Sequence, residues 1–171
     1  MKTNIVLTGF MGTGKTTTGK RIAQKLNMKF VDIDELIEQQ QNLTISQIFT
    51  EHGEAYFRDI ESKAVQQISM QDHLVIATGG GVVLRKENID NLSEKGYIIH
   101  LKADVDTIIR HTAGNDKRPL INDKDREKKI EQLLTQREEY YKQADTEVNV
   151  STLSVDEVVE TILDTVKSHM E

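Results

Sequence analysis

The chain alternates between short apolar runs and longer amphipathic segments. Short apolar runs between turn signals are typical of buried strands, and their alternation with helices predicts a parallel sheet covered by helices on both faces. The predicted strands are residues 4–8, 30–33, 73–77, 97–101 and 147–150. We therefore expect a single α/β domain over residues 1–171, in three layers around a central parallel five-stranded sheet.

Two segments differ sharply in their patterns. The segment after the last predicted strand carries one apolar stripe at helical spacing, formed by Val155, Val158, Val159, Ile162, Leu163 and Val166. In contrast, residues 112–129 are dense in charge and contain the chain's only proline, Pro119. Because this segment has little to bury, we expect a mobile surface loop that runs into a helix beginning near residue 124. On its pattern alone, a plain solvated loop is the alternative.

Composition and charge argue against several classes of protein. The 171 residues carry a net charge of −6 and include no cysteine, which disfavours general nucleic-acid binding and excludes disulfides and thiolate metal sites. No apolar run approaches the roughly 20 residues that a membrane helix needs, and the run at residues 5–7 is too short for a secretory signal. We expect a cytoplasmic protein without nucleic-acid or membrane partners, whose anionic ligands are held by local cations.

A phosphate-binding motif provides the firmest functional signal. Residues 9–16, GFMGTGKT, fit the pattern G-x-x-x-x-G-K-[ST] between a predicted strand and a predicted helix. Glycines let backbone N–H groups surround phosphate oxygens, and the helix N-terminus adds partial positive charge. We expect Lys15 to reach the β- and γ-phosphates of ATP and the Thr16 hydroxyl to bind Mg²⁺. The predicted loop residues that bind the nucleotide are Gly12, Thr13, Gly14, Lys15, Thr16 and Thr17.

The remaining sequence favours a small kinase among the proteins with this motif. A GTPase would normally carry an Asn-Lys-x-Asp motif, which is absent, and the chain is too short for most motor or transport ATPases. Asp32 and Asp34 follow the second predicted strand, where alternation would place them on one side. Two adjacent carboxylates at the carboxyl end of a strand suit Mg²⁺ and an acceptor hydroxyl. The alternative is that Asp34 only caps a helix beginning at Glu35.

Several further motifs together resemble the shikimate kinase family, in its order and spacing from about residue 5 to residue 165. These motifs are GFMG at 9–12, FVDIDELIE at 30–38, ISQIF at 45–49, GEAYFRDIE at 53–61, ATGGG at 77–81, RPL at 118–120, and Arg137 with Tyr141. The resemblance implies a nucleoside-monophosphate-kinase-like P-loop fold with a mobile lid at about residues 112–124 and an acceptor-binding region at about 33–61. It also implies transfer of the γ-phosphoryl group of ATP to the 3-hydroxyl of shikimate, a step toward chorismate and the aromatic amino acids.

The resemblance also implies roles for individual residues. Asp34 would hydrogen-bond the acceptor hydroxyl and act as the base, and Asp32 would help to hold Mg²⁺. Lys15 and the lid residue Arg118 would act on the phosphates, and Arg110 would stack on adenine. An exposed helix arginine is the alternative for Arg110.

The acceptor side of the site rests on arginines and glycines. By resemblance, Arg58, Arg137 and the triplet Gly79, Gly80 and Gly81 would bind shikimate. Arg137 also follows Ile130, Leu133 and Leu134 at helical spacing, so we expect it on an inward-facing stripe, where an arginine needs a partner. A structural ion pair is the alternative for Arg137, and pairing with Glu61 is the alternative for Arg58.

Other readings stay open at this point. Gluconate kinase or a nucleoside monophosphate kinase would share much of the pattern, and a non-catalytic ATP-binding regulatory module is a candidate of another class. The five histidines lack the spacing of metal ligands, and we assign them no catalytic role. The resemblance implies a monomer.

Overall fold

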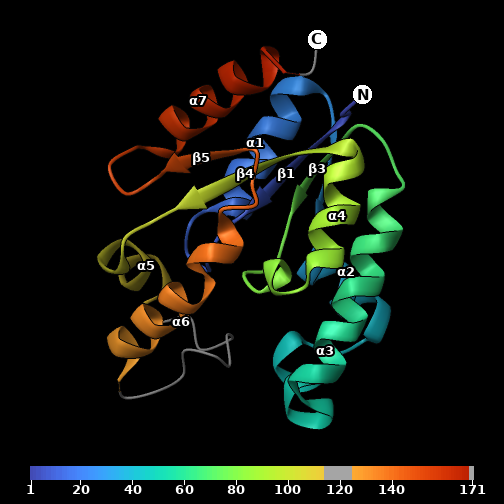
Figure 1. The fold of residues 1–171 in the computed structure, drawn as a ribbon, viewed down its shortest axis with the longest axis vertical. Coiled ribbons are helices and arrows are strands. Elements are labelled where there is room, and N and C mark those ends of the chain that lie inside the picture. The colour runs from blue at the N-terminus through green and yellow to red at the C-terminus, as the bar shows by residue number, and fades with distance from the viewer. Residues whose placement is uncertain (114–124, 170–171) are drawn as a thin grey trace.

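The computed structural model of the chain describes residues 1–113 and 125–169. Within them, five parallel strands form one sheet in the order β2-β3-β1-β4-β5 (Figure 1). The strands are β1 (Asn4–Thr8), β2 (Lys29–Asp32), β3 (Leu74–Ala77), β4 (Gly96–Lys102) and β5 (Thr146–Asn149). The predicted α/β class and its central five-stranded parallel sheet are confirmed.

Helices cover both faces of this sheet (Figure 1). Their bounds are α1 (Lys15–Leu26), α2 (Ile33–Gln41), α3 (Ile45–Ser69), the short 3₁₀-helix η1 (Val82–Leu84), α4 (Lys86–Lys95), α5 (Val105–Thr112), α6 (Arg126–Tyr141) and α7 (Val155–Lys167). Helices α1 and α7 pack together on one side, and α2, α3 and α4 form a second group on the other. The predicted apolar stripe of the last helix is confirmed, since five of its six residues are buried in α7.

Two hydrophobic cores separate the three layers. The central strand β1 alternates between them, because Ile5 and Leu7 enter the core under α1 and α7, whereas Val6 enters the core under α3 and α4. A strand that is buried on both faces has no need of polar positions, which explains the continuous apolar runs of the sequence.

The ends of several predicted elements were wrong by one or two residues. The second strand ends at Asp32, and Ile33 already begins α2. The third begins at Leu74 because His73 has a left-handed φ of 59°. The fifth ends at Asn149 rather than at residue 150, and α6 begins at Arg126 rather than near 124.

Strand β1 marks the point where the chain changes direction across the sheet. It lies between β3 and β4, so the chain first builds β2 and β3 on one side and then crosses to β4 and β5 on the other. In open α/β sheets, ligands bind outside the carboxyl ends of the strands at such a switch point. The loops that follow β1 and β3 therefore occupy the expected position for a binding site.

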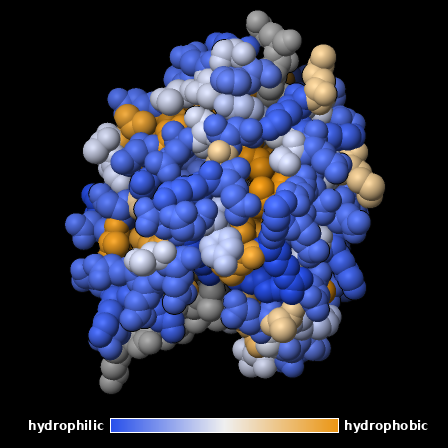
Figure 2. Space-filling model, in the orientation of Figure 1, coloured by the Kyte–Doolittle hydropathy of each residue, from blue (hydrophilic) through white to orange (hydrophobic). Residues whose placement is uncertain are grey.

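The surface of the molecule is mainly polar. On the face in Figure 2, hydrophilic side chains cover most of the area, and hydrophobic atoms show in a central strip and in smaller patches toward the left. Among the described residues, none of the helices is both long and apolar enough to cross a membrane.

Candidate active site

The phosphate-binding motif folds as a tight loop between β1 and α1. Gly12 and Gly14 have positive φ angles of 80° and 85°, which glycine adopts without strain, and Gly14 is the N-cap of α1. The buried Lys15 side chain turns back over the loop, and its Nζ donates to the carbonyl oxygens of Gly9 at 2.6 Å and Phe10 at 2.9 Å. The loop therefore joins a positive charge to the N-terminus of a helix, an arrangement that attracts phosphate.

Helix α5 supports this loop from the side of the predicted lid. The Nδ1 atom of His111 lies 2.8 Å from the Gly12 carbonyl oxygen, and a Cβ atom placed on Gly12 would lie 2.8 Å from Cγ2 of Thr112. This role for His111 was not predicted, because a histidine that donates to a backbone carbonyl needs no motif. Arg110, in the same turn, donates to the Thr107 hydroxyl at 3.2 Å.

Asp32 joins β2 to the phosphate loop. One carboxylate oxygen accepts from the backbone N–H groups of Asp34 and Glu35, and the other accepts from the Thr16 hydroxyl at 2.8 Å. Asp32, not Asp34, therefore caps the second helix, which corrects the alternative considered above. The pair of Thr16 and Asp32 offers adjacent oxygens of the kind that Mg²⁺ binds together with substrate phosphates.

Asp34 reaches the site for a different reason from the one predicted. Strand alternation does not apply, because Asp34 lies in the first turn of α2. Its carboxylate points toward the segment that follows β3. A Cβ atom placed on Gly79 would lie 3.0 Å from Oδ1 of Asp34 and 3.0 Å from Oε2 of Glu61.

An almost fully buried ion pair lies beside Asp34. The Arg58 side chain is 9% exposed and the Glu61 side chain 0%, and their Nη1 and Oε1 atoms are 2.9 Å apart. The pairing considered as an alternative for Arg58 is therefore present. The pKa of the Glu61 carboxyl is raised, mainly because the group is buried. The charge of Arg58 opposes this shift, and the charge of Asp34 adds to it. The Oε2 atom of Glu61 has no hydrogen-bond partner within the described ranges.

The glycine segment joins the predicted acceptor residues to the phosphate loop. Cβ atoms placed on Gly80 and Gly81 would lie 3.3 Å from Nη1 of Arg137 and 2.3 Å from Nη2 of Arg58. The same position on Gly80 is 3.5 Å from the backbone nitrogen of Met11 in the phosphate loop. Any larger residue would displace these guanidinium groups, so the glycines allow them to approach the backbone closely.

Arg137 lies on the inward side of α6, as its spacing predicted. It is 3% exposed, and its guanidinium lies over the Phe10 ring, 5.5 Å from the ring centre. Within residues 1–113 and 125–169 it forms no ion pair, so the structural ion pair considered above is not observed there. Burying a cation costs free energy, and an anion that binds beside the guanidinium would offset this cost.

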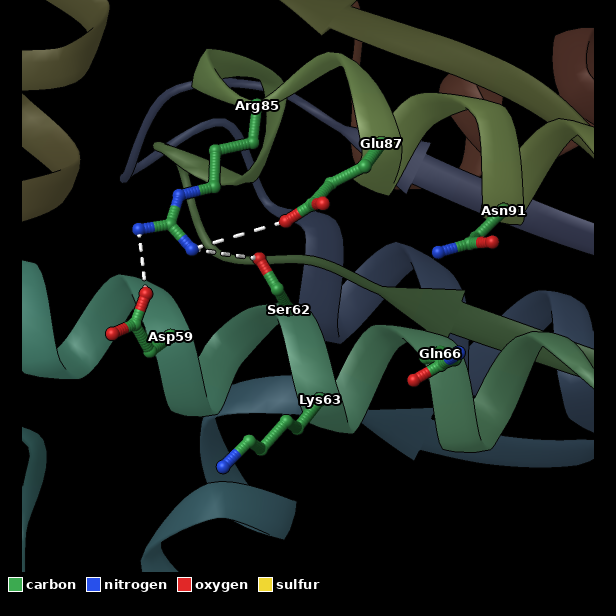
Figure 3. A pocket seen from close by; sticks show the side chains of 7 residues that line it. All are labelled: Asp59, Ser62, Lys63, Gln66, Arg85, Glu87 and Asn91. Carbon is green, nitrogen blue, oxygen red and sulfur yellow. Dashed lines mark hydrogen bonds and ion pairs between the residues drawn. The ribbon is translucent and has the colours of Figure 1, made fainter.

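A polar groove on the surface is lined by other residues. It has a volume of about 340 Å³ and runs between α3 and the start of α4 (Figure 3). Arg85 bridges it, pairing with Asp59 at 2.8 Å and donating to the Ser62 hydroxyl at 3.3 Å. These contacts fix α4 against α3, and none of the predicted site residues lines the groove.

The structure thus brings together Lys15, Thr16, Asp32, Asp34, Arg58, the glycine triplet and Arg137. The predicted lid arginine, Arg118, lies outside the described residues, as does most of the predicted lid at 112–124.

Comparison with known sequences agrees with this arrangement. A profile of the family described as "Shikimate kinase" matches residues 11–167. The chain is 47% identical over 160 residues to a shikimate kinase of Caldanaerobacter subterraneus subsp. tengcongensis, covering 94% of each chain. It is 46% identical to a shikimate kinase of Thermoanaerobacter pseudethanolicus, covering 94% of each.

Solved structures give the same result. Shikimate kinase from Acinetobacter baumannii in complex with shikimate has a TM-score of 0.94 and 31% identity, over 98% of this chain and 94% of that one. A gluconokinase from Sinorhizobium meliloti has a TM-score of 0.62 at 14% identity, over 98% and 94%, and shares the fold alone. By sequence and by structure, the chain belongs to the shikimate kinase family.

Proposed function

We propose that the chain transfers the γ-phosphoryl group of ATP to the 3-hydroxyl of shikimate, giving shikimate 3-phosphate and ADP. One observation carries the proposal most directly. The glycine segment after β3 lies against the phosphate loop and also contacts Asp34, Arg58 and Arg137. An acceptor bound on this segment would have its hydroxyl beside the phosphates, and phosphoryl transfer depends mainly on such positioning and on charge neutralisation.

On the nucleotide side, residues 12–17 would surround the phosphates. Lys15 would leave its contacts with Gly9 and Phe10 for the β- and γ-phosphates, and Arg110 would lie beside adenine. Thr16 and Asp32 fit Mg²⁺, which would neutralise charge on the phosphates when it is bound.

On the acceptor side, Arg58 and Arg137 would bind the carboxylate of shikimate, and Asp34 would accept the proton of its 3-hydroxyl. Both guanidinium groups are buried, which strengthens their attraction for a carboxylate. The Asp34 carboxylate lies on the same glycine segment as Arg137, so one acceptor molecule can contact both. Acceptance of a proton by a positioned side chain typically contributes about 10²- to 10⁴-fold to the rate.

Arg118 would complete the site from the lid at residues 112–124, where closure would exclude water and suppress ATP hydrolysis. Residue 118 lies outside the described residues. The single domain over residues 1–171, the monomeric state and the cytoplasmic location stay predictions.

The test is ADP release with MgATP and, separately, shikimate, quinate, gluconate and AMP at equal concentration. We expect release with shikimate to exceed release with each other acceptor by at least about tenfold, since a site built to pair polar groups rejects analogues that leave them unpaired. Release of ADP with gluconate instead would show that the protein is a kinase of this fold with a different acceptor. ATP binding without release for any acceptor would favour a regulatory module and would contradict the proposal.

A further inference from the structure

Tyr141, the last residue of α6, lies where three parts of the site meet. Its hydroxyl donates to the Gly80 carbonyl oxygen at 2.8 Å. Its ring stacks on His100 of β4, with ring centres 4.3 Å apart and planes 17° apart. Tyr141 and His100 are each 5% exposed. The hydroxyl therefore acts on the glycine segment from a ring that is held in place by packing.

The glycine segment needs such a contact because three consecutive glycines are conformationally permissive and costly to order. Two of its carbonyl groups are held locally, since Gly79 accepts from the Val82 backbone at 3.2 Å and Gly81 accepts from the Leu84 backbone at 3.1 Å. The middle carbonyl accepts from the Tyr141 hydroxyl. Because the peptide unit is planar, fixing the Gly80 carbonyl also fixes the direction of the Gly81 N–H group.

The same contact bears on Arg137. Residues four apart lie on one face of a helix, so Tyr141 and Arg137 both face the glycine segment from α6. Arg137 Nη1 lies 3.3 Å from the place where a Cβ atom on Gly80 would stand. The hydrogen bond from Tyr141 fixes the position of α6 relative to Gly80. Because Arg137 lies on the same helix, its guanidinium is also held beside Gly80.

His100 supplies the surface against which the tyrosine ring is held. It pairs in register with Thr8, the last residue of β1 before the phosphate loop. Burial, together with the positive charges of Lys15 and Lys102, lowers the pKa of His100 to about 4, so the ring is neutral near pH 7. A neutral flat ring can stack on tyrosine without bringing another charge into the site.

We propose that Tyr141 is a positioning residue for the acceptor: its hydroxyl, held by stacking on His100, fixes the Gly80 carbonyl and the place of Arg137 beside it. This inference rests on the proposed function, because it assigns Gly80 and Arg137 to acceptor binding. It predicts that loss of one hydroxyl group weakens the use of shikimate and leaves the nucleotide site intact.

The test compares Tyr141→Phe with Tyr97→Phe. Tyr97 is similarly buried, at 6% exposure, but it pairs with Ile5 at the opposite end of the sheet. For Tyr141→Phe we expect KM for shikimate to rise about tenfold, the equivalent of one net hydrogen bond, with KM for MgATP within about twofold of wild type. For Tyr97→Phe we expect both KM values to stay within about twofold. Melting temperatures of both variants are measured alongside.

Equal changes in the two KM values for Tyr141→Phe, or no change in either, would overturn the proposal. If Tyr141→Phe does not fold, His100→Ala takes its place, because it removes the stacking surface and leaves the hydroxyl unsupported. KM for shikimate should then rise at least about threefold with KM for MgATP unchanged, and an unchanged KM for shikimate would overturn the proposal. A wild-type protein that does not phosphorylate shikimate would instead refute the proposed function, and this inference with it.

Discussion

At the residue scale, the acceptor side of the site is built from buried charges. Glu61, Arg58 and Arg137 are all buried. Removal of water strengthens each attraction and raises the cost of a charge that is left without a partner. Glu61 neutralises Arg58, whereas Arg137 has no ion pair within residues 1–113 and 125–169. This difference makes Arg137 the residue best suited to a ligand carboxylate.

Replacing Arg137 by alanine should therefore act selectively on the acceptor. We expect Arg137→Ala to lower kcat/KM for shikimate by the equivalent of about 2–5 kcal/mol, the usual range for truncating one member of a buried charge pair. KM for MgATP should barely change. The matched control is Arg85→Ala, which removes an arginine from the groove between α3 and α4. A loss of ATP binding as large as the loss for shikimate would contradict the placement of Arg137.

Asp34→Asn should separate chemistry from binding. The amide keeps the size of the side chain but no longer accepts the hydroxyl proton, so kcat should fall by about 10²- to 10⁴-fold. Calorimetric affinity for ATP should stay close to wild type. Asp59→Asn, an exposed aspartate on α3, serves as the control. Near-normal turnover of Asp34→Asn would remove the proposed base from the mechanism.

The sequence was informative where a residue's own neighbours decide its place. The helical spacing of Arg137 predicted its inward position, and the motif predicted the phosphate loop. The stacking of His100 on Tyr141 joins elements far apart in sequence. Such a contact leaves no local periodicity, so only the fold reveals it.

At the scale of elements, α3 carries Arg58 and Glu61 on a helix that is broken once. Gly53 interrupts the helix with φ 83° and ψ 173°, a conformation open essentially to glycine alone. The first part of α3 begins with a capping box, in which Thr44 and Gln47 satisfy each other's backbone N–H groups. The kink therefore turns a well-anchored first segment relative to the segment that carries the buried ion pair.

Gly53→Ala should be destabilising for backbone reasons alone. No atom lies within 4 Å of a Cβ atom placed on Gly53, so a clash is not involved. We expect the free energy of unfolding to fall by about 1–3 kcal/mol, measured by urea denaturation with an unchanged m-value. In an ordinary helical position the same change would stabilise by about 0.5–1 kcal/mol. Increased stability would therefore show that the kink is not maintained.

The exact bounds of the elements were the least predictable feature at this scale. From the sequence, we predicted that Ile33 belongs to a strand and that strand alternation sets the direction of Asp34, but both residues lie in α2. In the structure, the Asp32 side chain accepts the first N–H groups of α2 and begins the helix two residues earlier than the alternative start at Glu35. A side chain that caps a helix competes with continuation of the strand, and the apolar pattern does not record the outcome.

At the scale of the whole molecule, the sheet order explains how distant segments form one site. The loops after β1 and β3 lie side by side, because Thr78 donates through both its backbone and its hydroxyl to the Leu7 carbonyl at 3.1 Å. Helix α6 then brings Arg137 and Tyr141 to the glycine segment from the other half of the chain. Nucleotide and acceptor residues are therefore parts of one folded unit, and global stability should affect both.

Stability at low pH should depend on His100. Its pKa is about 4 in the folded protein against an ordinary value of 6.5, so the unfolded chain binds the proton first as pH falls. The contribution of His100 to the free energy of unfolding is fully present above about pH 6.5. It falls progressively toward pH 4, where the loss is about 3 kcal/mol. Urea denaturation at pH 7, 5.5 and 4 should show a smaller loss for His100→Phe than for wild type. The control His52→Phe, at an exposed position, should lose as much as wild type, and an identical loss for His100→Phe would contradict this origin.

The central claim is that this site selects shikimate and directs phosphate to one hydroxyl. The most direct measurement is a competition in which the protein, MgATP and equal amounts of shikimate and gluconate are incubated together, and the products are identified by ³¹P and ¹H NMR. We predict phosphate on the 3-hydroxyl of shikimate, with gluconate unchanged. Phosphorylated gluconate, or phosphate on another hydroxyl of shikimate, would contradict the arrangement of Asp34, Arg58 and Arg137 around the acceptor.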